Sequence, residues 1–220
     1  MATKDHQSEP IESASETLQR IFDGHGSVLG SQMADESSRY DVLKKTDFPK
    51  PQRTRRIAVA NQKGGVGKTT STVNTAAALA NKGAQVLVID MDPQGNASTA
   101  LGVSHASGEP SVYDVIEGRS DLGDVITVCP DFPTLDVVPA SIDLSGAELE
   151  VADLPNRNTL LKEALDLYLR QSDKHYDYVF IDCPPSLGLL VINAMCAVTE
   201  MLIPIQAEYY ALEGLGQLIN

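Results

Sequence analysis

The sequence predicts a doubly wound α/β fold, with a mainly parallel sheet and helices on both of its faces. Three observations favour this fold. From residue 56 onward, short apolar runs alternate with helix-like stretches, several runs are apolar at every position, and a glycine-rich loop joins the first run to a helix. Continuous apolar runs are typical of parallel strands that helices cover on both sides. A ligand of such a sheet binds at the carboxyl ends of its strands.

The expected elements follow one another in regular alternation, and no internal repeat is found. Strands are expected at residues 57–60, 85–90, 134–139, 178–182 and 201–205. Helices are expected at residues 70–81, 111–117, 143–153, 158–171 and 189–197. The helix at 158–171 carries leucines and a tyrosine on one face, which indicates core packing rather than a cofactor site.

The loop after the first strand reads A-N-Q-K-G-G-V-G-K-T-T over residues 60–70. Its glycines let backbone N–H groups converge on an anion, and the N-terminus of the following helix adds a positive dipole end. This strand–loop–helix order is the context of a phosphate-binding loop, so ATP with Mg²⁺ is the expected ligand. We expect Lys68 to reach the β- and γ-phosphates and Thr69 to ligate Mg²⁺. The other expected phosphate contacts are Lys63, Gly64, Gly65, Val66, Gly67 and Thr70.

The loop departs from the ordinary pattern G-x-x-x-x-G-K-[ST] at its start. The first glycine of that pattern falls on Gln62, and a second lysine, Lys63, follows it. A loop that already has Lys68 gains little from another cation on the same phosphates. We therefore hypothesise that Lys63 reaches the phosphates of a facing subunit in an ATP-bound homodimer, where it acts on the developing charge.

Two of the expected strands end in aspartate, at Asp90 and Asp182. An apolar strand that closes on Asp beside such a loop is the Walker-B arrangement, in which the carboxylate holds Mg²⁺ through a water. Asp182 fits this role, and Asp90 is expected to support the Mg²⁺ shell. Asp92 lies in the turn D-P-Q-G-N, where it can orient or deprotonate the attacking water. The alternative for all three is that they cap turns and helices.

The net charge of −13 is unevenly distributed. Residues 1–56 hold 9 Lys/Arg and 9 Asp/Glu, whereas residues 57–220 hold 8 Lys/Arg and 21 Asp/Glu. We therefore expect the core to offer no basic face to DNA. No apolar run is long enough to span a membrane, and the first residues do not read as a signal peptide. The cysteines at 129, 183 and 196 fit no disulfide or zinc pattern, which favours a cytoplasmic protein.

Residues 1–54 are expected to form a disordered or partly helical tail, because they are polar and poor in β-branched and aromatic residues. A capping box at 13–16 and apolar residues at 18–22 predict a short helix, either a docking helix or a fraying one. Arg53, Arg55 and Arg56 either contact nucleic acid or form a solvated flank. Residues 55–220 are expected to form the ATPase domain without its C-terminal part, because the chain stops inside a helix-like stretch.

Four motifs, in this order, resemble the ParA/Soj family of chromosome and plasmid partitioning ATPases: A-N-Q-K-G-G-V-G-K-T-T, V-L-V-I-D-M-D-P-Q-G-N-A-S, Y-V-F-I-D-C-P-P-S-L-G and P-I-Q-A-E-Y-Y-A-L-E-G-L. These are deviant Walker-A ATPases related to MinD and to the nitrogenase iron protein. The resemblance implies that Lys63 is the signature lysine and that Lys68 binds phosphate. It also implies that Thr69 is the Mg²⁺ ligand, Asp92 the switch I residue and Asp182 the Walker-B acid, with switch II at 184–188.

The resemblance further implies a working cycle. The protein would dimerise on ATP, bind DNA non-specifically as a dimer, and hydrolyse ATP faster with a ParB-like partner, in the cytoplasm on the nucleoid. It implies no membrane partner, and it places DNA binding mainly in a segment that lies beyond this chain.

Four other functions remain as alternatives. A MinD-like positioning ATPase would need an amphipathic membrane helix, which this chain does not show. An iron-protein-like electron carrier would need paired cluster cysteines, and Cys183 and Cys196 do not suit that role. A tyrosine autokinase would need a larger terminal cluster than Tyr209 and Tyr210. A nucleotide-locked scaffold would not need intact acids at the positions expected for hydrolysis.

Overall fold

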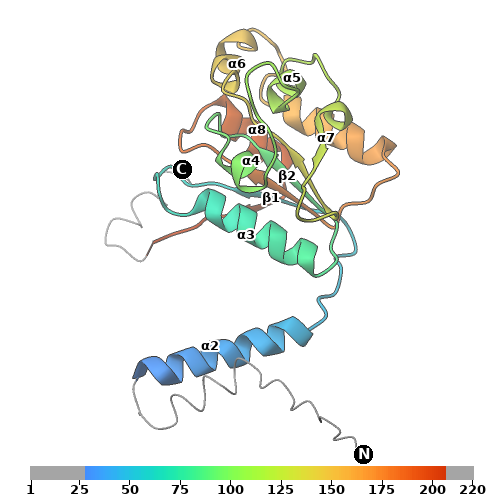
Figure 1. The fold of residues 1–220 in the computed structure, drawn as a ribbon. Helices are drawn as coiled ribbons and strands as arrows, with labels where there is room; N and C mark the ends of the chain where they lie inside the picture. Colours follow the sequence, from blue (N-terminus) through green and yellow to red (C-terminus); the bar gives the residue numbers. More distant parts are fainter. Residues whose placement is uncertain (1–27, 207–220) are drawn as a thin grey trace, which may run out of the picture. The chain divides into compact units, whose positions relative to one another are not determined.

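The computed structural model describes residues 28–206, which belong to two compact units that divide after Phe48 (Figure 1). In the first unit, α2 (Val28–Lys45) is a helix that the sequence analysis did not place within the expected tail. Residues 31–45 contain no Gly or Pro, which permits a continuous helix. Exposed apolar side chains of α2 include Met33, Tyr40, Val42 and Leu43. The short helix expected at 13–22 lies outside the described residues.

The second unit contains a six-stranded sheet in the order β3-β4-β2-β5-β1-β6. Neighbouring strands are parallel, except that β3 runs antiparallel to β4. The strands are β1 (Arg55–Val59), β2 (Val86–Asp90), β3 (Thr127–Val128), β4 (Leu135–Val138), β5 (Tyr178–Asp182) and β6 (Glu200–Leu202). The prediction of a mainly parallel, doubly wound sheet is confirmed.

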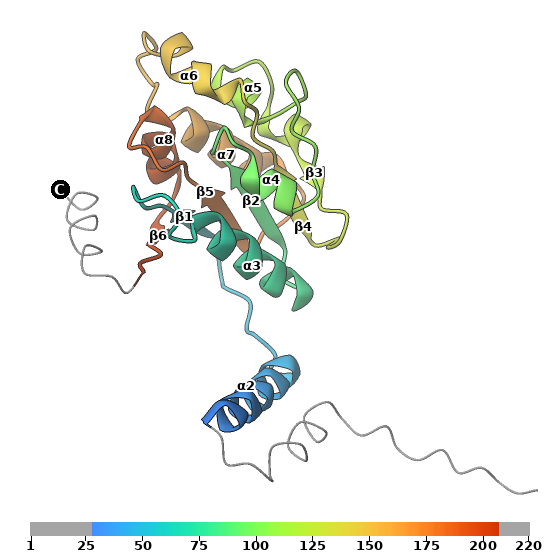
Figure 2. The same cartoon turned by 60° about the vertical axis from the view of Figure 1, so that its left-hand side comes forward.

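Helices cover both faces of this sheet, with α3 on one face and α7 and α8 on the other (Figures 1 and 2). A 3-10 turn, η1 (Leu122–Val125), precedes β3. The α-helices of this unit are α3 (Lys68–Asn81), α4 (Asn96–Ala100), α5 (Val112–Ile116), α6 (Leu144–Glu150), α7 (Leu160–Gln171) and α8 (Leu189–Ala197).

Alternate strand side chains pack into two separate cores. Val86 and Val88 of β2 belong to the core that includes Ala76 and Ala80 of α3. The alternate residues of β2, Leu87 and Ile89, belong to the core that contains the buried leucines of α7. Because successive strand side chains point to opposite faces and both faces are covered, the run is apolar at every position.

The last strand is shorter than predicted. β6 ends at Leu202, whereas the sequence analysis placed a strand over residues 201–205. Among the described residues β6 pairs with β1, and this pairing ends at Val59 opposite Leu202. Beyond that point β1 turns into the glycine-rich loop, so the strand loses its hydrogen-bonding partner. No helix in the described range of 28–206 is long and apolar enough to cross a membrane.

Candidate functional site

The glycine-rich loop lies at the carboxyl end of β1, and the adjacent strand β5 ends there in Asp182. Gly65 and Gly67 have φ values of +72° and +90°, in the left-handed region that favours glycine. A Cβ atom added at Gly64, Gly65 or Gly67 would meet no heavy atom within 4 Å. The loop therefore borders open space rather than packed side chains, which suits a backbone cradle for phosphate.

Two lysines occupy different positions on this loop. Lys68 begins α3 and is 8% exposed, and its ammonium Nζ lies 3.5 Å from the carbonyl oxygen of Lys63. An ammonium whose acceptor is a loop carbonyl can exchange that acceptor for a phosphate oxygen of a bound nucleotide. The side chain of Lys63 is exposed, as a lysine that reaches beyond its own subunit has to be.

Asp182 accepts from two hydroxyl groups in the first two turns of α3. The Thr69 hydroxyl donates to Oδ2 of Asp182 at 2.7 Å, and the Thr72 hydroxyl donates to Oδ1 at 2.8 Å. The structure thus brings together the expected Mg²⁺ ligand and the expected Walker-B acid. The sequence analysis missed Thr72, although its position three residues after Thr69 places both on one side of the helix.

Asp90 uses both carboxylate oxygens within its own loop. Its Oδ2 accepts hydrogen bonds from the backbone N–H and the hydroxyl of Ser98, at 2.8 and 2.7 Å. Its Oδ1 accepts from the N–H of Asp92 at 3.2 Å. Asp90 is fully buried and lies beside Asp182 in the sheet register. It therefore holds the turn that carries Asp92, which is the turn-capping alternative given for it from the sequence, and Ser98 is its main partner.

Asp92 lies in that turn and is 8% exposed. Its Oδ1 accepts from the N–H of Gln94 at 3.0 Å, and its carbonyl accepts from the N–H of Gly95 at 2.8 Å. The turn then leads into the short helix α4. The second carboxylate oxygen of Asp92 takes part in no recorded hydrogen bond within the described chain, so it is available to a water molecule.

The electrostatics of the acids suit a divalent cation. Burial raises the pKa of Asp90 to about 6, against the hydrogen bonds from Ser98 that lower it. Burial also raises the pKa of Asp182 to about 6, with smaller upward contributions from the charges of Asp90 and Asp92. A cation beside Asp182 would offset both the burial cost and the repulsion.

The donor set fits Mg²⁺ bound together with a nucleotide. Within residues 28–206, no group of three or more His, Cys, Asp or Glu side chains could hold a metal ion by itself. Mg²⁺ commonly takes one or two protein oxygens and fills its shell with water and substrate phosphates. Thr69 and Asp182 provide such a partial set beside the open loop.

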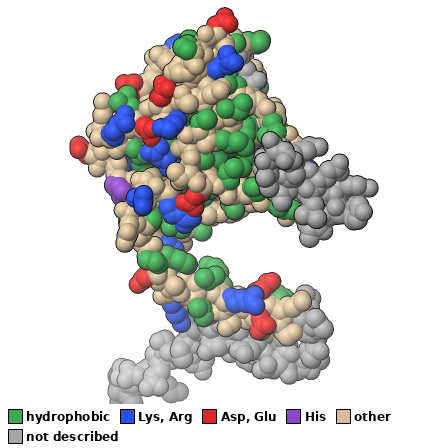
Figure 3. Space-filling model, turned by 180° about the vertical axis from the view of Figure 1, so that it is seen from behind, with side chains coloured by type: hydrophobic (Ala, Val, Ile, Leu, Met, Phe, Trp, Pro, Cys, Tyr) green, Lys and Arg blue, Asp and Glu red, His purple; other side chains and the backbone are tan. Residues whose placement is uncertain are grey.

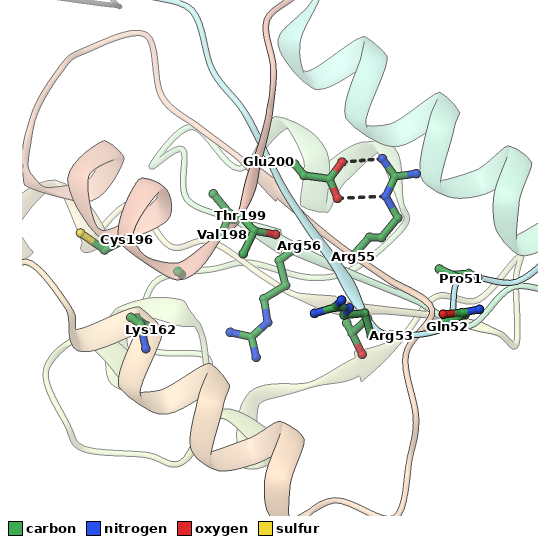
Figure 4. Close-up of a pocket in the computed structure, with 12 residues that line it drawn as sticks. Pro51, Gln52, Arg53, Arg55, Arg56, Lys162, Cys196, Val198, Thr199 and Glu200 are labelled. Atoms are coloured by element: carbon green, nitrogen blue, oxygen red, sulfur yellow. Dashed lines mark hydrogen bonds and ion pairs between the residues drawn. The ribbon is translucent and has the colours of Figure 1, made fainter.

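A separate pocket of about 780 Å³ lies at the amino ends of β1 and β6, at the other end of the strands from the glycine-rich loop (Figure 4). Arg55 forms a two-bond ion pair with Glu200, and Asp166 accepts from both Arg56 and Lys162. Figure 3 shows Lys and Arg side chains interspersed with Asp and Glu on the face seen from behind. The charge count did not anticipate the cations at this pocket, because it assigned the arginines before and in β1 to the tail. The cations that line the pocket are Arg53, Arg55, Arg56 and Lys162.

Known proteins share this fold and these motifs. A family model described as an AAA domain matches residues 54–220. The sporulation initiation inhibitor protein Soj of Bacillus subtilis is 51% identical over 164 residues, which cover 74% of this chain and 63% of that protein. The chromosome partitioning protein ParA of Caulobacter vibrioides is 47% identical over 164 residues, covering 74% of this chain and 60% of ParA.

A solved structure extends the comparison to a nucleotide complex. The cobyrinic acid a,c-diamide synthase from Mycobacterium smegmatis, solved with bound ADP and magnesium, is 40% identical with a TM-score of 0.68. The match covers 76% of this chain and 65% of that one. The chain spans about 60% of the length of the curated relatives it matches. From the family model, these relatives and the deviant glycine-rich loop, the chain belongs to the AAA-domain family of P-loop ATPases, within its ParA/Soj group.

Proposed function

We propose that the chain is the ATPase part of a DNA-partitioning protein, which hydrolyses ATP to ADP and phosphate with Mg²⁺. The observation that carries this proposal is the 2.7 Å hydrogen bond from Thr69 to Asp182 beside an open glycine-rich loop. The name of the ParA relative, a chromosome partitioning protein, supports the partitioning role, and the ADP–magnesium complex of the matched synthase supports the ligand.

Each site residue has a separate task in the proposed reaction. The loop N–H groups and Lys68 hold the β- and γ-phosphates, where charge develops on the leaving group. Thr69 and Asp182 would hold the magnesium ion, which would neutralise phosphate charge when bound. Asp92 orients the attacking water, and Asp90 fixes the turn that carries Asp92. The expected phosphate contacts are Lys63, Gly64, Gly65, Val66, Gly67, Lys68, Thr69 and Thr70.

The proposed active state is an ATP-bound homodimer in which Lys63 of one subunit contacts the phosphates of the other. Its exposure and its place before the first loop glycine support this proposal. We expect Lys63→Ala to reduce both dimerisation on ATP and hydrolysis. A Lys63→Ala protein that dimerises and hydrolyses ATP at the normal rate would contradict the role in trans.

The proposed cycle couples the nucleotide to DNA. The ATP dimer binds DNA non-specifically in the cytoplasm, on the nucleoid, mainly through a segment beyond this chain. A ParB-like partner accelerates hydrolysis and so releases the dimer. The printed name of the ParA relative supports chromosome partitioning, and the DNA and ParB-like steps of the cycle come from the resemblance to that family.

Nucleotide binding and phosphate release, measured separately, test the ATPase proposal. We expect Asp92→Ala to bind Mg–ATP but to lose at least about 100-fold in phosphate release, in line with removal of a group that activates water. We expect Lys68→Ala to weaken binding itself. Retention of the Mg–ATP form on DNA-coated beads, compared with lipid vesicles, tests the partitioning role. Retention on vesicles alone would favour the MinD-like alternative.

A further inference from the structure

Two side-chain amides tie the glycine-rich loop to the chain that follows β6. Asn61 donates from Nδ2 to the carbonyl oxygen of Pro204 at 2.8 Å, and its Oδ1 accepts from the N–H of Lys63 at 3.0 Å. Gln206 donates from Nε2 to the carbonyl oxygen of Gly65 at 3.0 Å. The chain after β6 is therefore bonded to the loop directly through Gln206 and indirectly through Asn61.

These bonds begin where the sheet ladder ends. The N–H of Ala60 donates to the carbonyl of Leu202 at 3.2 Å, which closes the pairing of β1 with β6. Beyond it the two backbones separate, and the amides of Asn61 and Gln206 span the gap between them. Asn61 is 8% exposed, so its bonds form in a largely desolvated environment where losing a partner is costly.

The contacts orient individual peptide groups of the loop. In a trans peptide the C=O and the following N–H point in opposite directions, and the described chain contains no cis peptide. Because Gln206 holds the Gly65 carbonyl, the N–H of Val66 is directed to the opposite side of that peptide group. A phosphate cradle depends on such N–H groups pointing at one site before the anion arrives.

We propose that Asn61 and Gln206 are positioning residues that set the phosphate loop for nucleotide, and that Gln206 makes the chain after β6 respond to nucleotide. This inference rests on the proposed ATPase function and adds a connection from the nucleotide site to the chain after β6. A contact that favours the nucleotide-binding conformation of the loop is itself favoured when nucleotide binds, because linkage is reciprocal. The chain after β6 is then coupled to nucleotide binding at the loop by the hydrogen bond from Gln206 to Gly65.

Neutral substitutions test the inference without adding charge near the phosphates. Gln206→Met keeps the length of the side chain and removes the donor, and Asn61→Ala removes both bonds of the buried amide. Gln171→Met, at the exposed end of α7, is the matched control. Mg–ADP affinity is measured by titration calorimetry, and kcat and KM for ATP by phosphate release. Hydrogen–deuterium exchange at the amides of residues 203, 205 and 206 is compared with and without Mg–ADP.

We expect Asn61→Ala to weaken Mg–ADP binding about 5- to 30-fold and Gln206→Met about two- to fivefold, with Gln171→Met unchanged. KM for ATP should rise, whereas kcat should stay within about twofold of the wild-type value. The reason is that the loop is positioned equally before and during phosphoryl transfer. Mg–ADP should slow exchange at the amides of residues 203, 205 and 206 in the wild-type chain, and Gln206→Met should abolish that protection. A residue with only a structural role would lower the unfolding temperature and leave the nucleotide-dependent protection in place.

Wild-type affinity together with retained protection in Gln206→Met would overturn the proposal. Because the Gln206 side chain is exposed, this variant remains decisive if Asn61→Ala fails to fold. A wild-type chain that binds Mg–ADP no better than Lys68→Ala would instead refute the ATPase proposal, and this inference with it. The two failures are thus told apart by the wild-type titration.

Discussion

Asp182 combines two hydroxyl donors with an unfavourable electrostatic environment. Thr69 and Thr72 donate to its two oxygens, yet burial and the neighbouring acids keep its pKa raised at about 6. Asp90 has a raised pKa of about 6 for the same first reason, burial. The nucleotide-free chain therefore keeps its acids in place at a cost in stability, which a bound cation would reduce.

Stability of the nucleotide-free chain should fall as pH rises from about 5 to 7.5. A raised pKa means that the folded chain binds protons more tightly than the unfolded chain, whose value is near the model 3.8. The stabilisation is complete below that value and is lost as pH rises through about 6. Asp182→Asn cannot titrate, so its unfolding temperature relative to wild type should increase with pH. The full rise of the Asp182 pKa from 3.8 to about 6 corresponds to at most about 3 kcal/mol of unfolding free energy.

Thermal unfolding of both proteins at pH 5, 6 and 7.5, with and without Mg–ADP, measures this difference. Mg–ADP should stabilise wild type more at pH 7.5 than at pH 5, since protonation of Asp182 competes with the cation. An offset between the two proteins that stays constant across the three pH values would count against a raised pKa at Asp182.

The Thr72 hydroxyl provides a second test at this acid. Thr72 is fully buried, and Thr72→Val keeps the shape of the side chain while leaving Oδ1 of Asp182 without this donor. We expect a loss of about 1–3 kcal/mol in unfolding free energy, measured by denaturant titration, and weaker Mg–ADP binding. Thr75→Val, on the exposed side of α3, should change neither quantity beyond about 0.5 kcal/mol. Equal effects of the two variants would remove the role given to Thr72.

At the scale of elements, sequence pattern predicted β5 and α8 with their observed ends. A strand buried on both faces is visible because every position is apolar. The helix after β1 begins at Lys68, two residues before the predicted start at residue 70. β3 could not be predicted in this way, because it has two exposed residues and depends on pairing with β4. α4 is five residues long and follows a turn that Asp90 organises from a distance, so its local sequence carries little signal.

Candidate site residues were predictable where a single stretch of sequence identifies them. The loop and its lysines are contiguous in sequence, and the acids end apolar strands. Ser98, Asn61 and Gln206 were missed because each binds backbone or side chains that only the fold brings near. The amide of Gln206, for example, meets a carbonyl that lies 141 positions away in the chain.

The turn that carries Asp92 depends on Gly95. Gly95 has a φ of +62°, and a Cβ at this position would lie 2.5 Å from Nδ1 of His105. Gly118 has a similar φ of +71°, but a Cβ there would meet nothing within 4 Å. Gly118→Ala should therefore cost about 1 kcal/mol of backbone strain, whereas Gly95→Ala adds a clash with the imidazole.

We expect Gly95→Ala to lower kcat for ATP at least about 10-fold while Gly118→Ala keeps it near wild type, because a shifted turn misplaces the attacking water. Phosphate-release assays and denaturant unfolding of the two variants separate the turn effect from strain. Identical kcat values in both would show that the Asp92 turn does not rely on this glycine.

Across the second unit, the carboxyl and amino ends of the parallel strands carry different charges. The carboxyl ends of the strands hold the three aspartates and the glycine-rich loop. The amino ends of β1 and β6, which we call the amino edge, hold the pocket lined by arginines and a lysine (Figure 4). At the amino edge, Arg56 and Lys162 share Asp166, and Arg53 forms no ion pair within residues 28–206. The pocket lining therefore carries four cations and one acid, Glu200, on a chain whose formal charge is −13.

This edge should contribute to DNA retention if the partitioning proposal is right. Arg53→Glu reverses an exposed charge and breaks no ion pair of the described residues, so it should lower retention of the Mg–ATP form on non-specific DNA about two- to fivefold at low salt. Arg119→Glu is the charge-matched control, because Arg119 pairs with Asp114 and Glu117 away from this pocket. The gap between the two variants should close as salt rises towards 0.3 M, since screening removes the phosphate attraction. Equal retention of both variants at low salt would place DNA binding outside this pocket.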